Sequence, residues 1–365
     1  MLARVRLPGG LVDAAQLRVL AGLADELGDG RVELTSRGNM QLRGLMADAA
    51  GPLTSELAEA GLLPSLSHDQ VRNILASPLA GLDRGADLTG IVRALDTALC
   101  ARPRLAQLSG RFLFAVDDGR GDVAGLGADV VASVRPDWAA VNGLAVPADG
   151  VVDAMLAFAE AFLDLRAEVR SSAWRVPDLP DGTERVRALV TARLGLAALP
   201  QELGGASGAR PVGLVVRETA GSGESAAFVR DDPGCSVVLI APLGRLTAAQ
   251  LTWVAERLGQ RVARITPWRS VVLPDLEDAA GVLREAAVLG FGTDDGSPWL
   301  RVTACAGRPG CASALADVQA DAAGFAARWP GRIVHVSGCG RHCGRPVATE
   351  IDVTATSEGY HVAGV

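Results

Sequence analysis

The sequence predicts an α+β fold made of two pseudo-symmetric repeats, and two observations support this. A turn-and-helix segment occurs twice: residues 7–17 read LPGGLVDAAQL and residues 241–251 read APLGRLTAAQL, with the tetrapeptide AAQL identical in both. Each copy is also followed by a longer stretch in which apolar strands and helical segments alternate. A duplication at such a distance along the chain indicates an internal pseudo-two-fold axis.

Each copy predicts a unit of strand, helix, strand and strand. Asp13 and Thr247 stand where the N-cap of a helix is expected, and apolar residues follow them at helical spacing. Gly28 and Gly259 then supply matching helix stops. The segments VELT and ARIT come next in the two copies, and each predicts a strand that a turn joins to a second short strand.

A larger α/β segment follows each copy. After the first copy we expect a strand over 111–117 and a helix near 151–169, and after the second copy the strands WLRVTAC and RIVHVSG. The stretches VPDLPDG and ELGGASGARP favour a linker between the two halves. The expected organisation is a first half-domain with its following helices over 1–95, a first α/β domain over 96–175, a linker over 176–210, a second half-domain over 211–292 and a second α/β domain over 293–365.

The composition excludes several chemistries. All 35 basic residues among the 365 are arginine. Without lysine, the chain cannot form a Walker A phosphate loop, a Schiff base or a lysine general base. Anions must be held by arginine, whose guanidinium group is permanently charged and forks onto carboxylates. The net charge of −7 leaves no basic field for a nucleic acid, so we expect no nucleic-acid partner.

The sequence also indicates where the protein works. The N-terminus, MLARVRLPGG, lacks the apolar core of a signal peptide, and no run elsewhere is long and apolar enough to span a membrane. We therefore expect a cytoplasmic protein without membrane association. Thiols stay reduced in that compartment, so paired cysteines are more often metal ligands or catalytic groups than disulfides.

Polar side chains on the strands distinguish the first copy from the second. Arg4 and Arg6 alternate with apolar residues and therefore project from one face of a strand, whereas their counterparts are Val238 and Ile240. The same replacement affects three further positions, since Arg37, Gln41 and Arg43 correspond to Trp268, Val272 and Pro274. Polar groups that one copy carries and its duplicate lacks predict an anionic ligand bound on one side of the molecule.

Four of the six cysteines lie near the C-terminus, in the segments TACAGRPGC and SGCGRHCGRP. They are Cys305, Cys311, Cys339 and Cys343, with the spacings C-x5-C and C-x3-C. Four thiolates can bind one tetrahedral zinc ion or a cubane [4Fe-4S] cluster. Glycines beside these cysteines let the backbone approach a cluster closely. The spacing favours a cluster, with a zinc site and unmetallated thiols as the alternatives.

On these residues the sequence resembles the sulfite and nitrite reductase family, in which a [4Fe-4S] cluster bound by C-x5-C and C-x3-C is coupled to sirohaem. The resemblance spans nearly the whole chain. The segments RVRLPGG, LTSRGNMQLRG, VRNILASP, the strand that begins at Arg111 and both cysteine pairs occur in the family's order. The family's fold implies two ferredoxin-like half-domains, each followed by an α/β domain of the sulfite reductase type.

The resemblance implies roles for individual residues. The four cysteines would bind the cluster, and the sulfur of Cys343 would bridge it to the haem iron. Arg72 and Arg111 would contact an anionic substrate, and His68, four residues before Arg72, is a further catalytic candidate. The residues expected to bind the tetrapyrrole cofactor or substrate are Arg4, Arg6, Arg37, Gln41, Arg43 and Asn73.

Two departures separate the chain from a true sulfite reductase. The second basic position that flanks the substrate is Leu113 here, and the chain ends soon after the cysteines. Both features resemble the precorrin-3B synthase branch of the family. That branch implies an O2-dependent monooxygenase of aerobic cobalamin biosynthesis, which hydroxylates precorrin-3A at C20 with lactone formation. The alternatives are a sirohaem- and cluster-dependent reductase of sulfite or nitrite, and a non-catalytic iron–sulfur or tetrapyrrole-binding protein.

The implied cofactors are a [4Fe-4S] cluster and either sirohaem or a mononuclear non-haem iron, whose ligands the sequence does not reveal. The expected tetrapyrrole substrate is precorrin-3A. No nucleotide-binding glycine motif follows a strand, so we expect a separate reductase or a ferredoxin to supply electrons.

Overall fold

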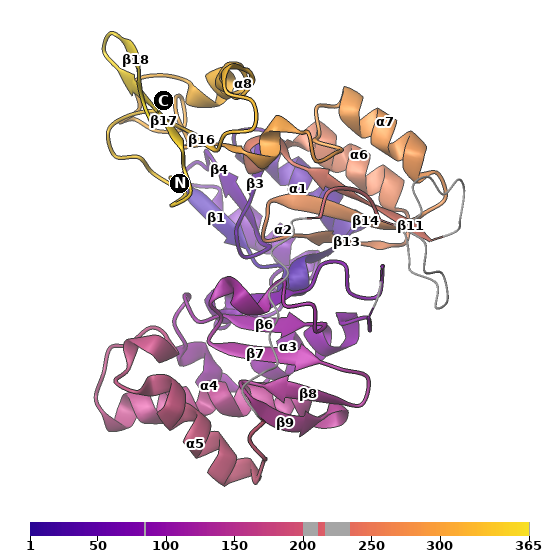
Figure 1. Cartoon of the computed structure of the whole chain (residues 1–365), viewed down its shortest axis with the longest axis vertical. Helices are drawn as coiled ribbons and strands as arrows, with labels where there is room; N and C mark the ends of the chain where they lie inside the picture. Colours follow the sequence, from indigo (N-terminus) through magenta and orange to yellow (C-terminus); the bar gives the residue numbers. More distant parts are fainter. Residues whose placement is uncertain (84, 200–210, 216–233, 365) are drawn as a thin grey trace.

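The computed structural model describes residues 1–83, 85–199, 211–215 and 234–364. Its strands form four sheets, and helices cover them (Figure 1). Two sheets belong to the half-domains at the middle of the molecule, and the other two belong to the α/β domains that follow each half-domain. The predicted α+β fold with two pseudo-symmetric repeats is confirmed.

The two half-domain sheets exchange a strand. The first sheet has the order β1 (Leu2–Val5), β4 (Met40–Arg43), β3 (Arg31–Leu34) and β12 (Arg245–Thr247). The second has the order β10 (Gly213–Val215), β11 (Cys235–Ile240), β14 (Ser270–Leu276), β13 (Val262–Ile265) and β2 (Leu11–Asp13). The strand β12 of the second repeat thus pairs with β3 of the first, and β2 of the first repeat pairs with β13 of the second.

Each exchanged strand leads directly into a helix. The side chain of Asp13 caps α1 (Ala14–Leu27) and that of Thr247 caps α6 (Ala248–Leu258), both in a complete capping box. The two helices pack together, and their apolar faces share one core with both sheets. Helices α2 (Ala50–Glu59) and α7 (Ala279–Val288) complete the half-domains. Both predicted N-caps and helix stops are confirmed.

The two α/β domains share a topology. In the first, β5 (Ile74–Ala76), β6 (Phe114–Asp117) and β7 (Val130–Val134) are parallel, and β8 (Trp138–Val141) and β9 (Leu144–Pro147) continue antiparallel. In the second, β15 (Val302–Ala304), β16 (Val334–Ser337) and β17 (Ile351–Thr356) are parallel, and β18 (Gly359–Ala363) is antiparallel. Helices α3 (Thr89–Cys100), α4 (Val151–Glu168) and α5 (Gly182–Leu194) pack on the first domain and α8 (Val318–Arg328) on the second.

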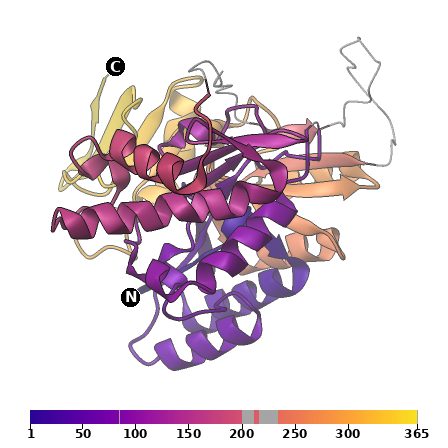
Figure 2. The same cartoon turned by 90° about the horizontal axis from the view of Figure 1, so that it is seen from below.

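Two expected boundaries differ from the structure. The expected linker over 176–210 contains helix α5, whose Val186 and Val190 are buried in the core of the first α/β domain beside α4 (Figure 2). The glycine and proline pattern reflects the turn before α5, where Asp181 adopts a positive φ, rather than a connection between domains. The remainder, 200–210, lies outside the described residues, as do 216–233 of the expected second half-domain.

The first half-domain also ends earlier than expected. Strand β5 lies before residue 95 and helix α3 extends across it, yet both contribute to the core of the first α/β domain. The last buried residue of the half-domain core in this part of the chain is Leu62, and Val71 already belongs to the next core. Within the described residues, no helix has the length and apolar character needed to cross a membrane.

The strand exchange predicts a strict requirement for glycine at position 10. Gly10 has φ of +71°, and a Cβ atom there would lie 2.0 Å from the carbonyl oxygen of Ile265, at the end of β13. We expect Gly10→Ala to lower the free energy of unfolding by about 3 kcal/mol, because the two repeats must separate at this contact. Denaturant titration would measure the change.

Gly22→Ala is the matched control. A Cβ atom at Gly22, in the middle of α1, would have no neighbour within 4 Å. This substitution should raise the free energy of unfolding by up to about 1 kcal/mol, because alanine favours the helix. Equal stability of the two variants would contradict the proposed tight contact between the repeats.

Candidate functional site

A polar network covers the outer side of the first half-domain sheet. Strand alternation directs Arg4, Gln41, Arg43 and Glu33 away from the core. The Arg4 guanidinium donates to Gln41 Oε1 at 3.1 Å, Gln41 Nε2 donates to Glu33 Oε2 at 3.0 Å, and Arg43 Nε donates to the same carboxylate at 2.6 Å. We call this surface, together with Arg6, which directly follows β1, the arginine face. Four of the predicted binding residues therefore lie together.

The end of the arginine face nearest the first α/β domain concentrates positive charge. Arg6 is 6% exposed, and its Nε atom has no hydrogen-bond partner within the described part of the chain. Burial, together with the charges of nearby Arg4 and Arg37, lowers the pKa of Arg6 to about 10. Burial and neighbouring arginines also lower the pKa of Arg37. An anionic ligand would relieve both effects, since it supplies negative charge and hydrogen-bond acceptors.

Arg37 lies in the turn between β3 and β4. Its guanidinium group donates to the carbonyl oxygens of Gly110 and Arg111 at 2.9 and 3.0 Å. It thereby connects the first half-domain to the first α/β domain at the border of the arginine face.

The equivalent face of the second half-domain is closed. The pair Val238 and Val272 occupies the register of Arg4 and Gln41, as the repeat comparison predicted. Both valines pack against Leu79 and Leu82 of the first α/β domain. This face also carries Arg264, opposite Val272, but its guanidinium is buried and donates to the carbonyl oxygens of Pro78 and Ala80. The two equivalent faces therefore differ in that one is covered by the first α/β domain.

The four predicted cluster ligands lie around one cavity. Cys305, Cys311, Cys339 and Cys343 line a space of about 420 Å³, together with Glu33 and Arg43 of the first half-domain. Cys305 follows β15, and Cys339 follows β16 after one glycine. Ligands of α/β sheets commonly bind at the carboxyl ends of parallel strands. The cysteine cavity thus opens onto the arginine face.

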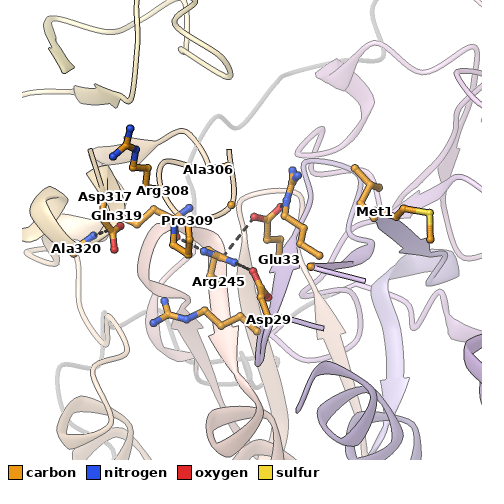
Figure 3. Close-up of a pocket in the computed structure, with 15 residues that line it drawn as sticks. Met1, Asp29, Glu33, Arg245, Ala306, Arg308, Pro309, Asp317, Gln319 and Ala320 are labelled. Carbon is orange, nitrogen blue, oxygen red and sulfur yellow. Dashed lines mark hydrogen bonds and ion pairs between the residues drawn. The ribbon is translucent and has the colours of Figure 1, made fainter. Parts of the chain in front are cut away.

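A second cavity adjoins the first. It has a volume of about 810 Å³ and shares Glu33, Arg43 and Arg245 with the cysteine cavity. Figure 3 shows Arg245 at its centre, with Asp29 and Glu33 on one side and residues 306–320 of the second α/β domain on the other. The two cavities form a groove between the first half-domain and the second α/β domain.

The cysteine cavity suits an iron–sulfur cluster better than zinc. Thiolates on one tetrahedral zinc ion lie about 3.8 Å apart, as follows from a bond length of about 2.3 Å. Among the described residues, the one group of three or more ligand side chains within 4.8 Å of one another consists of Asp117, Asp118 and Asp122, not of cysteines. Sulfurs that stand further apart fit separate irons at the corners of a cubane.

The backbone around the cysteines also fits a cluster. The amide of Gly338 donates to Cys305 Sγ at 3.1 Å. A Cβ atom at this glycine would lie 2.7 Å from Cβ of Ala314. The glycine is therefore needed for the close approach of backbone N–H groups to sulfur, which tunes the electronic properties of such clusters.

Two predicted site residues next to the half-domain have structural partners. Arg72 is 3% exposed, and its guanidinium forms a two-bond pair with the Asp96 carboxylate at 2.7 and 2.8 Å. Asn73 is also buried, and its amide group donates to the carbonyl oxygens of Gln70 and Gly110 at 2.9 and 3.1 Å. Both side chains hold the junction between the first half-domain and the first α/β domain.

His68, a predicted catalytic residue, is not free to act in this structure. It is 3% exposed. Its Nδ1 atom lies 2.9 and 3.0 Å from the hydroxyls of Ser65 and Ser67, and its Nε2 atom lies 3.1 Å from the carbonyl oxygen of Arg102. Sequence proximity to Arg72 suggested access to the site, but the chain turns the ring toward the segment that follows α3. The catalytic role of His68 stays a prediction, and in this structure both ring nitrogens have hydrogen-bond partners.

Arg111 and Leu113 differ in environment. The Arg111 guanidinium is exposed and lies over the ring of Trp174, with Cζ 4.2 Å from the ring centroid. Leu113 is 4% exposed and packs with Leu75, Ala115 and Val123. The position that would hold a second cation is thus part of a small apolar core.

Sequence reasoning missed three polar residues of the site. The first is Glu33, whose carboxylate accepts hydrogen bonds from both Gln41 and Arg43.

The second is Arg245. Its Nη2 donates to Asp29 Oδ2 at 2.8 Å, and its guanidinium also contacts Gln319. Gln319 in turn donates to the carbonyl oxygen of Cys305. The alternation of Arg245 with buried Leu246 predicts an outward side chain. Only the strand exchange, however, places this second-repeat residue on the first repeat's sheet.

The third missed residue is Arg175. Its Nε donates to Asp129 Oδ2 at 3.0 Å, and its charge contributes to the lowered pKa of Arg37. It lies in the segment that was expected to end the first α/β domain, where no motif marked it.

Comparisons with known proteins agree with this architecture. Residues 1–60 match the family model of the nitrite/sulfite reductase ferredoxin-like half domain. The chain is 28% identical to a ferredoxin–nitrite reductase of Synechococcus elongatus, over 100% of this chain and 78% of the relative. It is also 28% identical to a precorrin-3B synthase of a Sinorhizobium species, over 99% of this chain and 78% of the relative.

A solved structure shows the same fold. The NirA protein of Mycobacterium tuberculosis superimposes with a TM-score of 0.70 and 21% identity, over 99% of this chain and 73% of that one. The chain is therefore similar in fold to NirA and similar in sequence to nitrite reductases and a precorrin-3B synthase. The resemblance to the sulfite and nitrite reductase family, including its precorrin-3B synthase branch, is confirmed.

The cysteine cavity predicts a metal site that depends on Cys311. We expect Cys311→Ser to abolish the broad visible absorption of an iron–sulfur cluster and to lower the iron content, because serine is a poor ligand for this iron. Cys100→Ser, in α3 and outside the cavity, should change neither. Stoichiometric zinc in the unmodified protein, without iron, would contradict the prediction.

Proposed function

We propose that the chain is an oxidoreductase that acts on a tetrapyrrole held against the arginine face, beside a [4Fe-4S] cluster on the four cysteines. The specific reaction we propose is that of precorrin-3B synthase, the O2-dependent hydroxylation of precorrin-3A at C20 with lactone formation. The observation that carries this proposal is the asymmetry of the two half-domain sheets. One outer face carries Arg4, Gln41 and Arg43 beside the cysteine cavity. The equivalent face is covered, and its own arginine, Arg264, is buried with backbone carbonyl partners.

The chain's own residues would bind and orient the substrate. Arg6, Arg37 and Arg4 would hold peripheral carboxylates through charge-assisted hydrogen bonds. Glu33 restricts Gln41 and Arg43 to the surface of the sheet and so keeps the face rigid before the ligand arrives. Such preorganisation lowers the entropic cost of binding a large anion.

The cluster and the groove would have separate tasks. When bound, the cluster would supply electrons one at a time while an iron centre activates dioxygen. Cys305, Cys311, Cys339 and Cys343 would hold the cluster at the end of the groove that adjoins Arg43. One relative is named a ferredoxin–nitrite reductase, which supports an external electron donor here. Another is named a precorrin-3B synthase, which supports a tetrapyrrole substrate.

A sirohaem- and cluster-dependent nitrite or sulfite reductase is the second candidate. The equal identity to a ferredoxin–nitrite reductase, over the whole of this chain, favours it. The burial of Leu113 weakens it, because the second of the two positions expected to flank a small anion is then apolar and part of a core. A protein whose sirohaem spectrum survives desalting would favour the reductase over the synthase.

The arginine face predicts that tetrapyrrole binding depends on Arg37. Arg37→Ala should weaken binding of uroporphyrin III, a carboxylate-rich tetrapyrrole, by about ten- to a hundredfold, since a charge-assisted interaction is lost. Fluorescence titration of the full chain would measure this. Arg18→Ala, an exposed change on the opposite side of the half-domain in α1, should leave the affinity unchanged. Equal losses in both variants would argue against the one-sided site.

The synthase reaction predicts a gain of oxygen in the product. We expect anaerobic loading with precorrin-3A and a reductant, followed by air, to yield a product heavier by one oxygen atom, with label from ¹⁸O2 detected by mass spectrometry. Consumption of sulfite or nitrite without this product would contradict the synthase activity and support the reductase activity. Tetrapyrrole binding without turnover under either condition would indicate a non-catalytic carrier.

A further inference from the structure

Trp174 is an aromatic side chain that is fixed in place although half of it is exposed. Its relative exposure is 50%. Its backbone N–H donates to Asp178 Oδ2 at 3.0 Å, and its carbonyl oxygen accepts a hydrogen bond from Ser109 Oγ at 2.8 Å. The Arg111 guanidinium lies over the ring. The segment therefore presents the indole in an ordered position rather than leaving it on a loose surface loop.

This indole borders the arginine face. The peptide of Gly110 and Arg111 is held from one side by the Arg37 guanidinium, through two carbonyl oxygens. From the other side, Arg111 extends over Trp174. The next residue, Arg175, influences the pKa of Arg37 more than any other charged neighbour does. Trp174 is thus connected to Arg37, at the border of the arginine face, through the backbone and side chain of Arg111.

The local chemistry favours a large ring over a small oxyanion. Leu113 is buried in an apolar cluster and offers no charge to the site. Arg111 rests on an aromatic ring, and the exposed part of that ring offers apolar area beside the cationic groups. A tetrapyrrole has both features that such a surface recognises, a flat apolar macrocycle and carboxylates at its rim.

Resting on the proposed function, we infer that Trp174 is a specificity-determining residue, the aromatic wall of the tetrapyrrole site. Its indole contacts the apolar macrocycle, while Arg111, held beside it, meets a carboxylate at the rim. The pair selects a carboxylate-bearing macrocycle against small anions, which gain nothing from the indole.

The test compares two tryptophan–arginine pairs. Trp253 also carries an arginine over its ring, Arg257 at 5.6 Å, on the outer side of α6 in the second half-domain. The full chain and its Trp174→Ala, Trp174→Phe and Trp253→Ala variants are titrated with uroporphyrin III, and quenching of the indole fluorescence is recorded. Mellitate, a small aromatic hexacarboxylate, serves as the competitor. It carries carboxylates but no macrocycle, so its binding reports the charged contacts alone. Pigment that copurifies is compared by its rate of release from the same variants.

We expect Trp174→Ala to weaken uroporphyrin binding, or speed pigment release, by about tenfold. Trp174→Phe should keep most of the affinity and lose the quenched emission component, while Trp253→Ala should match the unmodified chain. The inhibition constant of mellitate should stay the same in Trp174→Ala. If the unmodified chain binds a tetrapyrrole in an Arg37-dependent manner but Trp174→Ala binds it equally well, the inference on Trp174 is wrong. If the unmodified chain binds no tetrapyrrole, the proposed function itself fails.

Discussion

The reciprocal exchange of β2 and β12 is the contact on which the rest of the molecule depends. Each half-domain sheet is completed by a strand from the other repeat, so neither sheet is complete alone. Because the exchanged strands lead directly into α1 and α6, the pairing also sets the packing of these helices in a shared core. The exchange brings Arg245, from the second repeat, onto the sheet that carries Arg4 and Gln41. The polar groove is therefore a product of both halves of the chain.

Duplication supplied two equivalent sheet faces, and the chain uses them differently. On the second sheet, Val238 and Val272 pack under Leu79 and Leu82, which gains the free energy of burying apolar area. On the first sheet, Arg43 and Arg245 line two adjoining cavities. The charged side of the scaffold is less stable by itself, since Arg6 is buried near other cations. A buried arginine near other cations lowers local stability, and such residues are expected at a binding site, where function rather than stability selects them.

The cysteine domain is connected to this groove through polar side chains rather than through a large apolar interface. Arg245 joins Asp29 of the first half-domain to Gln319 of α8 (Figure 3). Gln319 in turn donates to the carbonyl oxygen of Cys305. The first half-domain is therefore linked to the cysteine loops through a short series of hydrogen bonds. The same groups bring the proposed electron source and the proposed substrate to one surface of the molecule.

The sequence by itself determined the repeat, the helix caps at Asp13 and Thr247 and the polar face of β1, because each depends on a local pattern or on the similarity of two segments. The spacing within each cysteine pair likewise marked the four cysteines that line one cavity. Tertiary structure alone decided which residues are accessible. Arg72 and His68 have the right chemistry, yet Asp96 and the Arg102 carbonyl engage them. Arg245 joins the site only because strands far apart in sequence pair. Partners of this kind are set by chain topology and burial, which no local pattern encodes.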